Sequence, residues 1–197
     1  EGGGGGCVGA MEGMGVGCCG RGQGVEWGLN AEWWVGLAVT AVGGGSSVVL
    51  TTKGARDVID AAGQWSVMVS GSSGEADVAI WGGLMTAGAY ARGFEGAILD
   101  GGVRDITEIR RDYDFPVFSR SASPGTTLGR FKTLGSNIPV VCGGIEVHPG
   151  DIIVADIDGV VVVPQALAAE VLKMSQEIDK RELEQAKLIV QAGSLKE

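Results

Sequence analysis

The sequence predicts an α/β fold, because apolar strand patterns and helical patterns alternate along much of the chain. Between residues 77 and 99 a strand, a helix and a second strand follow one another, which is typical of a parallel crossover. A strand-rich stretch and one long helix come next. At 197 residues the chain is long enough for a single domain with a substantial core, and we expect one domain over residues 1–197.

The individual elements follow from apolar and β-branched runs that are bounded by glycine and polar turns. The first expected elements are a strand at 37–42, a helix at 55–62, strands at 66–70 and 77–81, a helix at 84–92 and a strand at 96–99. A short helix at 106–111 and strands at 115–119, 139–147, 151–155 and 160–163 follow. The last helix, 165–192, starts after Pro164 and ends before Gly193. Its length indicates that it reaches a neighbouring subunit.

Residues 1–35 differ from ordinary globular sequence, because nearly half of the 36 glycines fall in the first 50 positions. Such a stretch is typical of a flexible linker, and a second hypothesis is that its residue assignment is doubtful, which peptide mass mapping would decide. We attribute the G-x-G-x-x-G pattern at Gly15, Gly17 and Gly20 to chance. No apolar strand leads into it, as a dinucleotide site requires.

The composition excludes several classes of function. A net charge of −9 disfavours sequence-independent binding to phosphate backbones. The sequence has no run of about 20 apolar residues and no basic region followed by an apolar one, so we expect a cytoplasmic protein without a membrane or nucleic-acid partner. The four cysteines and single histidine lack the spacing of a structural zinc site. Cys142 lies in an apolar run and is expected to be a buried thiol.

One hexapeptide, Asp-Gly-Gly-Val-Arg-Asp at 100–105, carries the chemistry of a candidate site. Its two glycines allow a tight turn or a close approach to a ligand. Arg104 offers a planar fork to a carboxylate, and Asp105 can hold a hard divalent cation. The local sequence equally fits a surface ion pair between these two residues. Gly82 and Gly83 precede a helix, so they mark either an anion-binding helix start or close packing of a strand on that helix.

Taken together, several segments resemble the RraA-like family, from about residue 36 onward. These segments are Trp-Gly-Gly-Leu-Met at 81–85, residues 97–105, Phe-Pro-Val-Phe at 115–118, and residues 147–156 and 158–164. The family includes the 4-hydroxy-4-methyl-2-oxoglutarate/4-carboxy-4-hydroxy-2-oxoadipate aldolases. The resemblance implies a swivelling β/β/α sandwich of the RraA-like type, assembled as a homotrimer or a hexamer with active sites between subunits.

The resemblance also implies roles for particular residues. An Arg-Asp dipeptide serves pyruvate and a divalent metal in the aldolases, so Arg104 would bind the carboxylate and keto oxygen, and Asp105 would anchor Mg²⁺ or Mn²⁺. The backbone that follows Gly82 and Gly83, with the amides of Leu84 and Met85, would hold the pyruvate carboxylate.

A glutamate from the last helix of the adjacent subunit is expected nearby, with Glu182 as first choice and Glu184 as second. The sequence departs from the aldolase pattern at Gly83, where the pattern has an acidic residue. Asp100 is the nearest replacement by sequence.

The expected function is that of a metal-dependent lyase that cleaves a 4-hydroxy-2-oxo acid to pyruvate. The enolate stabilisation that this needs would also permit oxaloacetate decarboxylation. A Schiff-base route needs a desolvated lysine, whereas the lysines, Lys132 among them, lie in polar stretches or on the last helix. The alternatives are an RraA-type protein that binds and regulates an RNA-degrading endonuclease without catalysis, and a structural trimer with a vestigial pocket.

Overall fold

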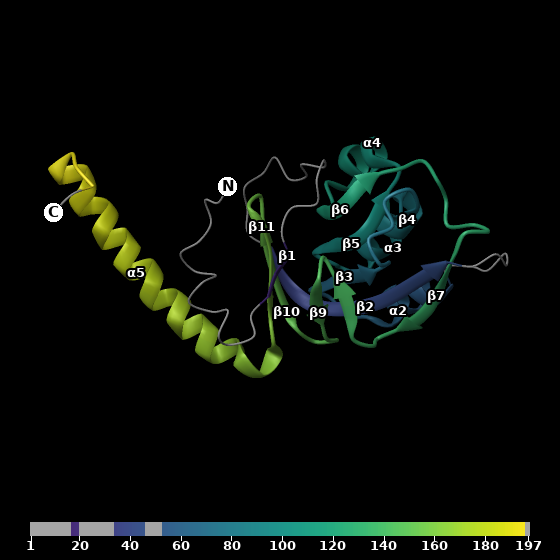
Figure 1. Cartoon of the computed structure of the whole chain (residues 1–197), viewed down its shortest axis with the longest axis horizontal. Helices are drawn as coiled ribbons and strands as arrows, with labels where there is room; N and C mark the ends of the chain where they lie inside the picture. The colour runs from purple at the N-terminus through teal and green to yellow at the C-terminus, as the bar shows by residue number, and fades with distance from the viewer. Residues whose placement is uncertain (1–16, 20–33, 46–52, 196–197) are drawn as a thin grey trace.

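A computed structural model describes residues 17–19, 34–45 and 53–195 of the chain (Figure 1). Most of the glycine-rich segment 1–35 lies outside the described residues. The two hypotheses for it, a flexible linker and a doubtful residue assignment, therefore concern residues that the structure does not describe. Among the described residues, no helix is both long and apolar enough to cross a membrane.

A mixed sheet forms the centre of the fold, and the spatial order of its main path is β1-β11-β10-β2-β3-β5-β4. Strand β6 also pairs with β5, and β7 pairs with β2. The strands are β1 (Gly17–Cys19), β2 (Trp34–Gly45), β3 (Ser66–Gly71), β4 (Ala79–Trp81), β5 (Gly96–Val103), β6 (Val117–Ala122), β7 (Phe131–Ser136), β10 (Ile152–Asp156) and β11 (Gly159–Val163). The pairs among β2, β3, β4, β5 and β6 are parallel, whereas β1, β7, β10 and β11 pair antiparallel.

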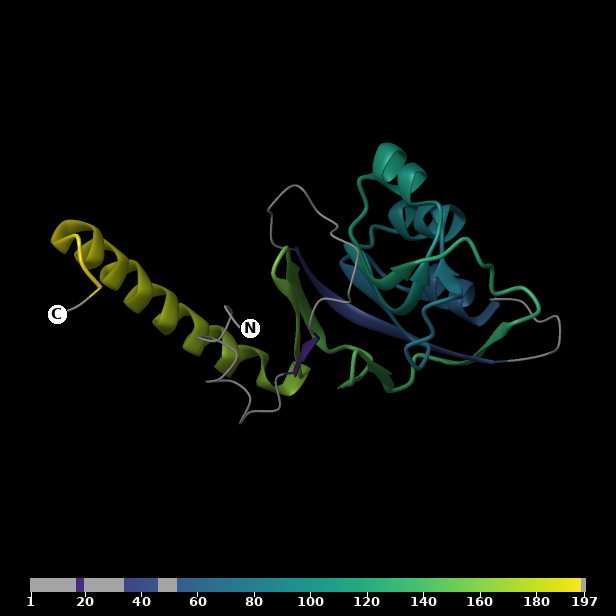
Figure 2. The ribbon, with the colours of Figure 1, turned by 45° about the horizontal axis from the view of Figure 1, so that its top comes forward.

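Helices α2 (Lys53–Ala61) and α3 (Gly83–Ala91) pack beside each other against the parallel strands (Figures 1 and 2). One buried cluster joins the strands to these helices, and includes Met68, Trp81, Ala89, Leu99 and Ile109. A second cluster, with Val67, Ile98, Val147, Ile153 and Val162, joins the strands to β10, β11 and the hairpin of β8 (Val140–Cys142) and β9 (Ile145–Val147). Cys142 belongs to it and is buried, as predicted. The expected α/β sandwich is confirmed.

The hexapeptide does not form the turn that its glycines suggest, because β5 continues through residues 100–103. The first half of β5 pairs with β3, and Gly102 and Val103 pair with β4. A Cβ on Gly102 would lie 2.9 Å from the Val78 carbonyl oxygen and 3.1 Å from that of Ala76. These glycines therefore serve close backbone packing.

Three further expectations need correction. The single strand at 139–147 is a hairpin, because Gly143 and Gly144 adopt φ values of 60° and 85° between β8 and β9. The helix at 106–111 is one turn, α4 (Ile106–Glu108), followed by a π-helical turn, η2 (Ile109–Tyr113). Strand β7 was not expected, since its half-exposed edge position does not produce a buried apolar pattern.

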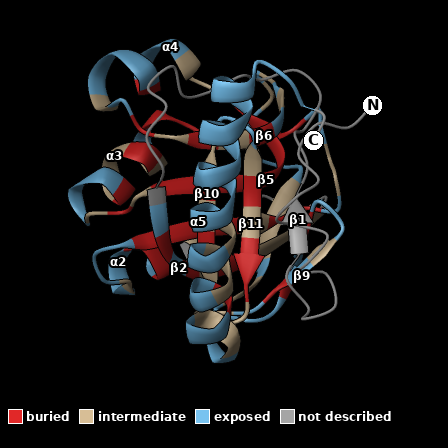
Figure 3. Ribbon diagram, turned by 90° about the vertical axis from the view of Figure 1, so that its left-hand side faces the viewer, coloured by how far each residue is buried: buried red, intermediate tan, exposed pale blue. Residues whose placement is uncertain are grey.

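The long C-terminal helix is confirmed. A 3₁₀ turn, η3 (Gln165–Leu167), leads into α5 (Ala168–Ala192), which Gly193 ends with a φ of 63°. Helix α5 projects from the β10–β11 side of the sheet, away from α3 and α4 (Figures 1 and 2). Only Val171 is buried on it, and most of its surface is exposed (Figure 3). This helix therefore has few contacts within its own chain.

Candidate active site

The candidate site lies where β4 and β5 end. The two strands are parallel neighbours, so their carboxyl ends meet at one edge of the sheet. Strand β4 leads through Gly82 into α3, and β5 leads through Arg104 and Asp105 into α4. The amide of Arg104 donates a hydrogen bond of 3.1 Å to the carbonyl of Trp81, which joins the two strand ends. The structure thus brings together the two segments that the sequence analysis predicted as parts of a site, the helix start at Gly82 and Gly83 and the end of the hexapeptide.

Asp105 has a left-handed backbone, with φ 58° and ψ 29°, which is uncommon outside glycine but tolerated by aspartate. Its carboxylate makes no capping hydrogen bond to α4. Instead, Oδ2 accepts a hydrogen bond of 3.0 Å from the amide of Gly83. Arg104 Nη1 lies 3.2 Å from the same oxygen, and both side chains remain partly exposed. The ion pair that the local sequence allowed is present, and it is attached to the first turn of α3.

Gly82 is required by the close approach of this ion pair. A Cβ at this position would lie 2.7 Å from Asp105 Oδ2 and 2.9 Å from Arg104 Cγ, distances that carbon atoms do not tolerate. Any side chain would therefore displace the arginine or the aspartate.

The first turn of α3 presents free amides beside the ion pair. Among the described residues, none accepts a hydrogen bond from the amide of Leu84 or Met85. These amides precede the first intrahelical hydrogen bond and lie at the positive end of the helix dipole. Together with the Arg104 guanidinium they form a surface suited to a small carboxylate.

Trp81 and Thr86 fix this helix start. The Trp81 indole donates a hydrogen bond of 2.8 Å to Thr86 Oγ1, and the Thr86 hydroxyl donates one of 3.2 Å to the Gly82 carbonyl. The Trp81 ring stacks on Phe115 with ring centres 6.3 Å apart. Both Trp81 and Thr86 are buried. The first turn of α3 consequently has a rigid base.

Asp100 is not available as the replacement acid at Gly83. Its buried carboxylate accepts a hydrogen bond of 3.0 Å from the amide of Gly74 and forms an ion pair with Arg120. The Ser72 hydroxyl donates to the Asp100 carbonyl at 2.5 Å. Asp100 therefore holds the 72–74 loop and β6 against β5.

Glu108 is the site carboxylate that the sequence reasoning missed. It lies on α4, exposed, and its carboxylate lies beside Gly83. Its position three residues after Asp105 at a helix start was the available signal, because such residues share one face. The nearby Asp112 is engaged elsewhere: hydrogen bonds from Arg111 and its positive charge lower the pKa of the Asp112 carboxyl.

The carboxylates of Asp105 and Glu108 both lie beside Gly83, and carboxylate oxygens are the ligands that hard divalent cations prefer. No group of three or more His, Cys, Asp or Glu side chains gathers in metal-binding proximity within the described ranges. Two carboxylates are nevertheless sufficient for Mg²⁺ or Mn²⁺, which usually retain several water ligands.

Glu182 is exposed on α5, and α5 projects away from α3 and α4 (Figure 1). Helical spacing places it on one face with Val171, Ile178 and Ile189. Its assignment to the site of an adjacent subunit stays a prediction.

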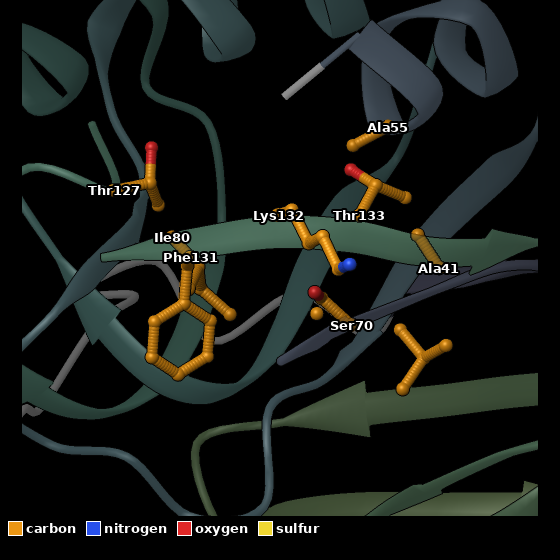
Figure 4. Close-up of a pocket in the computed structure, with 10 residues that line it drawn as sticks. Ala41, Ala55, Ser70, Ile80, Thr127, Phe131, Lys132 and Thr133 are labelled. Atoms are coloured by element: carbon orange, nitrogen blue, oxygen red, sulfur yellow. The ribbon is translucent and has the colours of Figure 1, made fainter. Parts of the chain in front are cut away.

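A separate pocket lies between α2, β2 and β7 (Figure 4). It is lined by Ala41, Val42, Gly43, Ala55, Ser70, Ile80, Thr127, Phe131, Lys132 and Thr133. Lys132 is half-buried here, with its side chain extending toward Ser70 (Figure 4). Lys132 lies on β7, a strand of the same sheet, and its side chain contributes to the pocket lining while staying partly exposed.

The chain belongs to the RraA-like family, described as Aldolase/RraA, whose pattern matches residues 16–162. Among its relatives, a Halalkalibacterium halodurans protein named as a candidate 4-hydroxy-4-methyl-2-oxoglutarate aldolase is 36% identical over 113 residues, 56% of this chain and 51% of that protein. The chain thus spans about half the length of this relative.

Solved structures show the same fold. An uncharacterized protein from Pseudomonas syringae has a TM-score of 0.79 and 31% identity, with 95% of this chain and 84% of that one covered. RraAS2 of Streptomyces coelicolor, described as an unusual member of the RNase ES inhibitor RraA family, has a TM-score of 0.76 at 22% identity, with 89% and 87% covered.

Proposed function

We propose that this protein is a divalent-metal-dependent lyase that releases pyruvate from a 4-hydroxy-2-oxo acid and also decarboxylates oxaloacetate. The observation that carries the proposal is the junction of Arg104, Asp105 and the first turn of α3, linked by the 3.0 Å hydrogen bond from Gly83. The name of the Halalkalibacterium halodurans relative supports the same reaction class.

The chain's own residues bind and orient the substrate. The free amides of Leu84 and Met85 hold the carboxylate of the 2-oxo acid, and Arg104 contacts the carboxylate and the keto oxygen. An arginine suits this position because its planar fork can donate two hydrogen bonds at once. The Arg104 side chain is 40% exposed, so its guanidinium is accessible to a small ligand.

Asp105, with Mg²⁺ or Mn²⁺, completes the proposed site. The bound cation supplies positive charge that stabilises a developing enolate. The left-handed backbone of Asp105 positions its carboxylate on the Gly83 side, where it can hold the cation beside Arg104.

Self-association as a homotrimer or hexamer is part of the proposal. Helix α5 projects with three exposed apolar side chains on one face, Leu172, Leu183 and Val190. Their spacings of about three and two turns align them along the helix. Burial of this surface by another subunit would remove apolar area from water and place Glu182 near a neighbouring site.

The test is pyruvate release from 4-hydroxy-4-methyl-2-oxoglutarate and from oxaloacetate, measured with Mg²⁺ or Mn²⁺, after EDTA treatment, and in Arg104→Ala. We expect turnover that EDTA abolishes and that metal restores, and turnover at least about a hundredfold lower in the variant. The absence of metal-dependent turnover on both substrates would contradict the proposal. It would favour the second candidate, a protein-binding regulator with the fold of RraAS2.

A further inference from the structure

The carboxylate of Glu108 occupies the space that a side chain at position 83 would take. A Cβ on Gly83 would lie 2.9 Å from Glu108 Cδ and 3.2 Å from Oε2, with Oε1 as its nearest neighbour. Residue 83 is the position at which this sequence lacks the acid of the aldolase pattern. A carboxylate therefore stands beside the first turn of α3 after all, supplied by α4.

Two carboxylates contact the same glycine. Asp105 Oδ2 accepts the hydrogen bond of the Gly83 amide, and Glu108 lies on the side of the missing Cβ. Arg104 pairs with Asp105, and in the described part of the chain no ion pair reaches Glu108. The positive charge of Arg111 also acts on Glu108, but the Arg111 guanidinium donates its hydrogen bonds to Asp112. The Glu108 carboxylate oxygens therefore remain available to a cation.

The position of Glu108 is not that of a helix cap. None of the first-turn amides of α3 donates a hydrogen bond to its carboxylate, and Gly83 donates to Asp105 instead. The amides of Leu84 and Met85 consequently stay available for a ligand anion while Glu108 stands beside them. A residue that served only the helix dipole would be expected on those amides.

We propose that Glu108 supplies the second carboxylate of the divalent-cation site, through the space that Gly83 leaves open. This inference refines the cation site of the function proposed above and rests on that function. Glu108 and Asp105 hold Mg²⁺ or Mn²⁺ between α4 and the start of α3, and the remaining ligand positions belong to water and substrate.

Mn²⁺ affinity of the full chain, measured by isothermal titration calorimetry without substrate, tests the inference. We expect Glu108→Gln to weaken binding about tenfold or more, as loss of one ligand does. Glu95→Gln is the matched control, because Glu95 precedes β5 at the opposite end of that strand and loses the same charge. It should bind Mn²⁺ as the wild type does.

A relocation experiment supplies a second measurement. In Glu108→Ala the space beside Gly83 is empty, so Gly83→Asp in that background returns a carboxylate to the same place from α3. We expect the double variant to recover most of the affinity that Glu108→Ala loses. An aspartate in the first turn of α3 is also favourable for the helix.

The outcomes separate this inference from the proposed function. Wild-type affinity in Glu108→Gln, or no Mn²⁺ binding by the wild type, would overturn the role of Glu108. Loss of affinity in Glu108→Gln with recovery in the double variant supports it, even if no substrate releases pyruvate, and the proposed reaction alone then fails. If Glu108→Gln does not fold, judged by circular dichroism, Glu108→Asp retains the charge with a shorter reach and should bind Mn²⁺ more weakly.

Discussion

The amide of Gly83 donates a hydrogen bond of 3.0 Å to Asp105 Oδ2, across 22 positions of sequence. The bond connects the first turn of α3 to the residue that follows β5. It holds a partly exposed carboxylate beside amides that have no partner among the described residues. The start of α3 and the Arg104-Asp105 dipeptide after β5 are each compatible with many kinds of site. The hydrogen bond joins them into one.

Gly82→Ala should disrupt the site, because the new methyl group would lie 2.7 Å from Asp105 Oδ2 and 2.9 Å from Arg104 Cγ. A displacement of this size lowers kcat/KM for pyruvate release by about a hundredfold. Gly63→Ala is the control, since nothing lies within 4 Å of a Cβ there. Steady-state kinetics of both variants decide the question, and equal activities would contradict the geometry.

Arg104→Lys should raise KM for the 2-oxo acid and lower kcat. A lysine keeps the charge but cannot donate two parallel hydrogen bonds, so we expect a loss of about 2 kcal/mol in transition-state binding. Arg92→Lys makes the same change at the end of α3, where the guanidinium donates to the Ala62 carbonyl at 3.0 Å. Only the Arg104 variant should lose kcat/KM.

Lys132 distinguishes the metal route from a Schiff-base route. If turnover depends on metal, borohydride reduction with pyruvate should leave no adduct on Lys132, and Lys132→Met should keep EDTA-sensitive activity. Mass spectrometry of the reduced protein is the measurement. A reduced pyruvate adduct on Lys132, together with turnover that EDTA does not inhibit, would instead show that the half-buried lysine of the β7 pocket performs the chemistry.

Leu183→Asp should weaken self-association, because it puts a charge into the exposed apolar face of α5 formed with Leu172 and Val190. Gln191→Asp adds the same charge about 100° around the helix from Val190 and should have little effect. Sedimentation velocity measures both. A wild type that sediments as a single 20.1 kDa chain would contradict the assembly.

Asp100→Ala should destabilise the fold without a direct effect on the site. It removes the buried partner of Arg120 and the acceptor of the Gly74 amide, and we expect a loss of about 2 to 3 kcal/mol in the free energy of unfolding. Asp112→Ala is the control, an exposed carboxyl whose folded-state pKa is lowered by Arg111. Ionised Asp112 makes a small contribution to the free energy of unfolding. This contribution is fully present above the unfolded-state pKa of the carboxyl and is lost as the pH falls through its folded-state pKa. Urea titrations at neutral pH should separate the two variants.

Much of this protein is determined by its sequence alone. Apolar runs, glycine turns and helical spacing are local patterns, so they predicted the α/β class, most strands and the long last helix. The family resemblance identified Arg104 and Asp105 as the centre of interest, and their side-chain types already indicate carboxylate and cation chemistry.

Only the tertiary structure decided which groups meet. The pairing of β5 with β4 put Asp105 on the Gly83 amide, and the left-handed Asp105 backbone turned its carboxylate away from α4. The same packing buried Asp100 under Arg120 and put Glu108 beside Gly83. Their distances from Asp105 along the chain could not show that Glu108, and not Asp100, lies beside Gly83. The neighbours of a side chain depend on strand register and backbone angles, which no local pattern encodes.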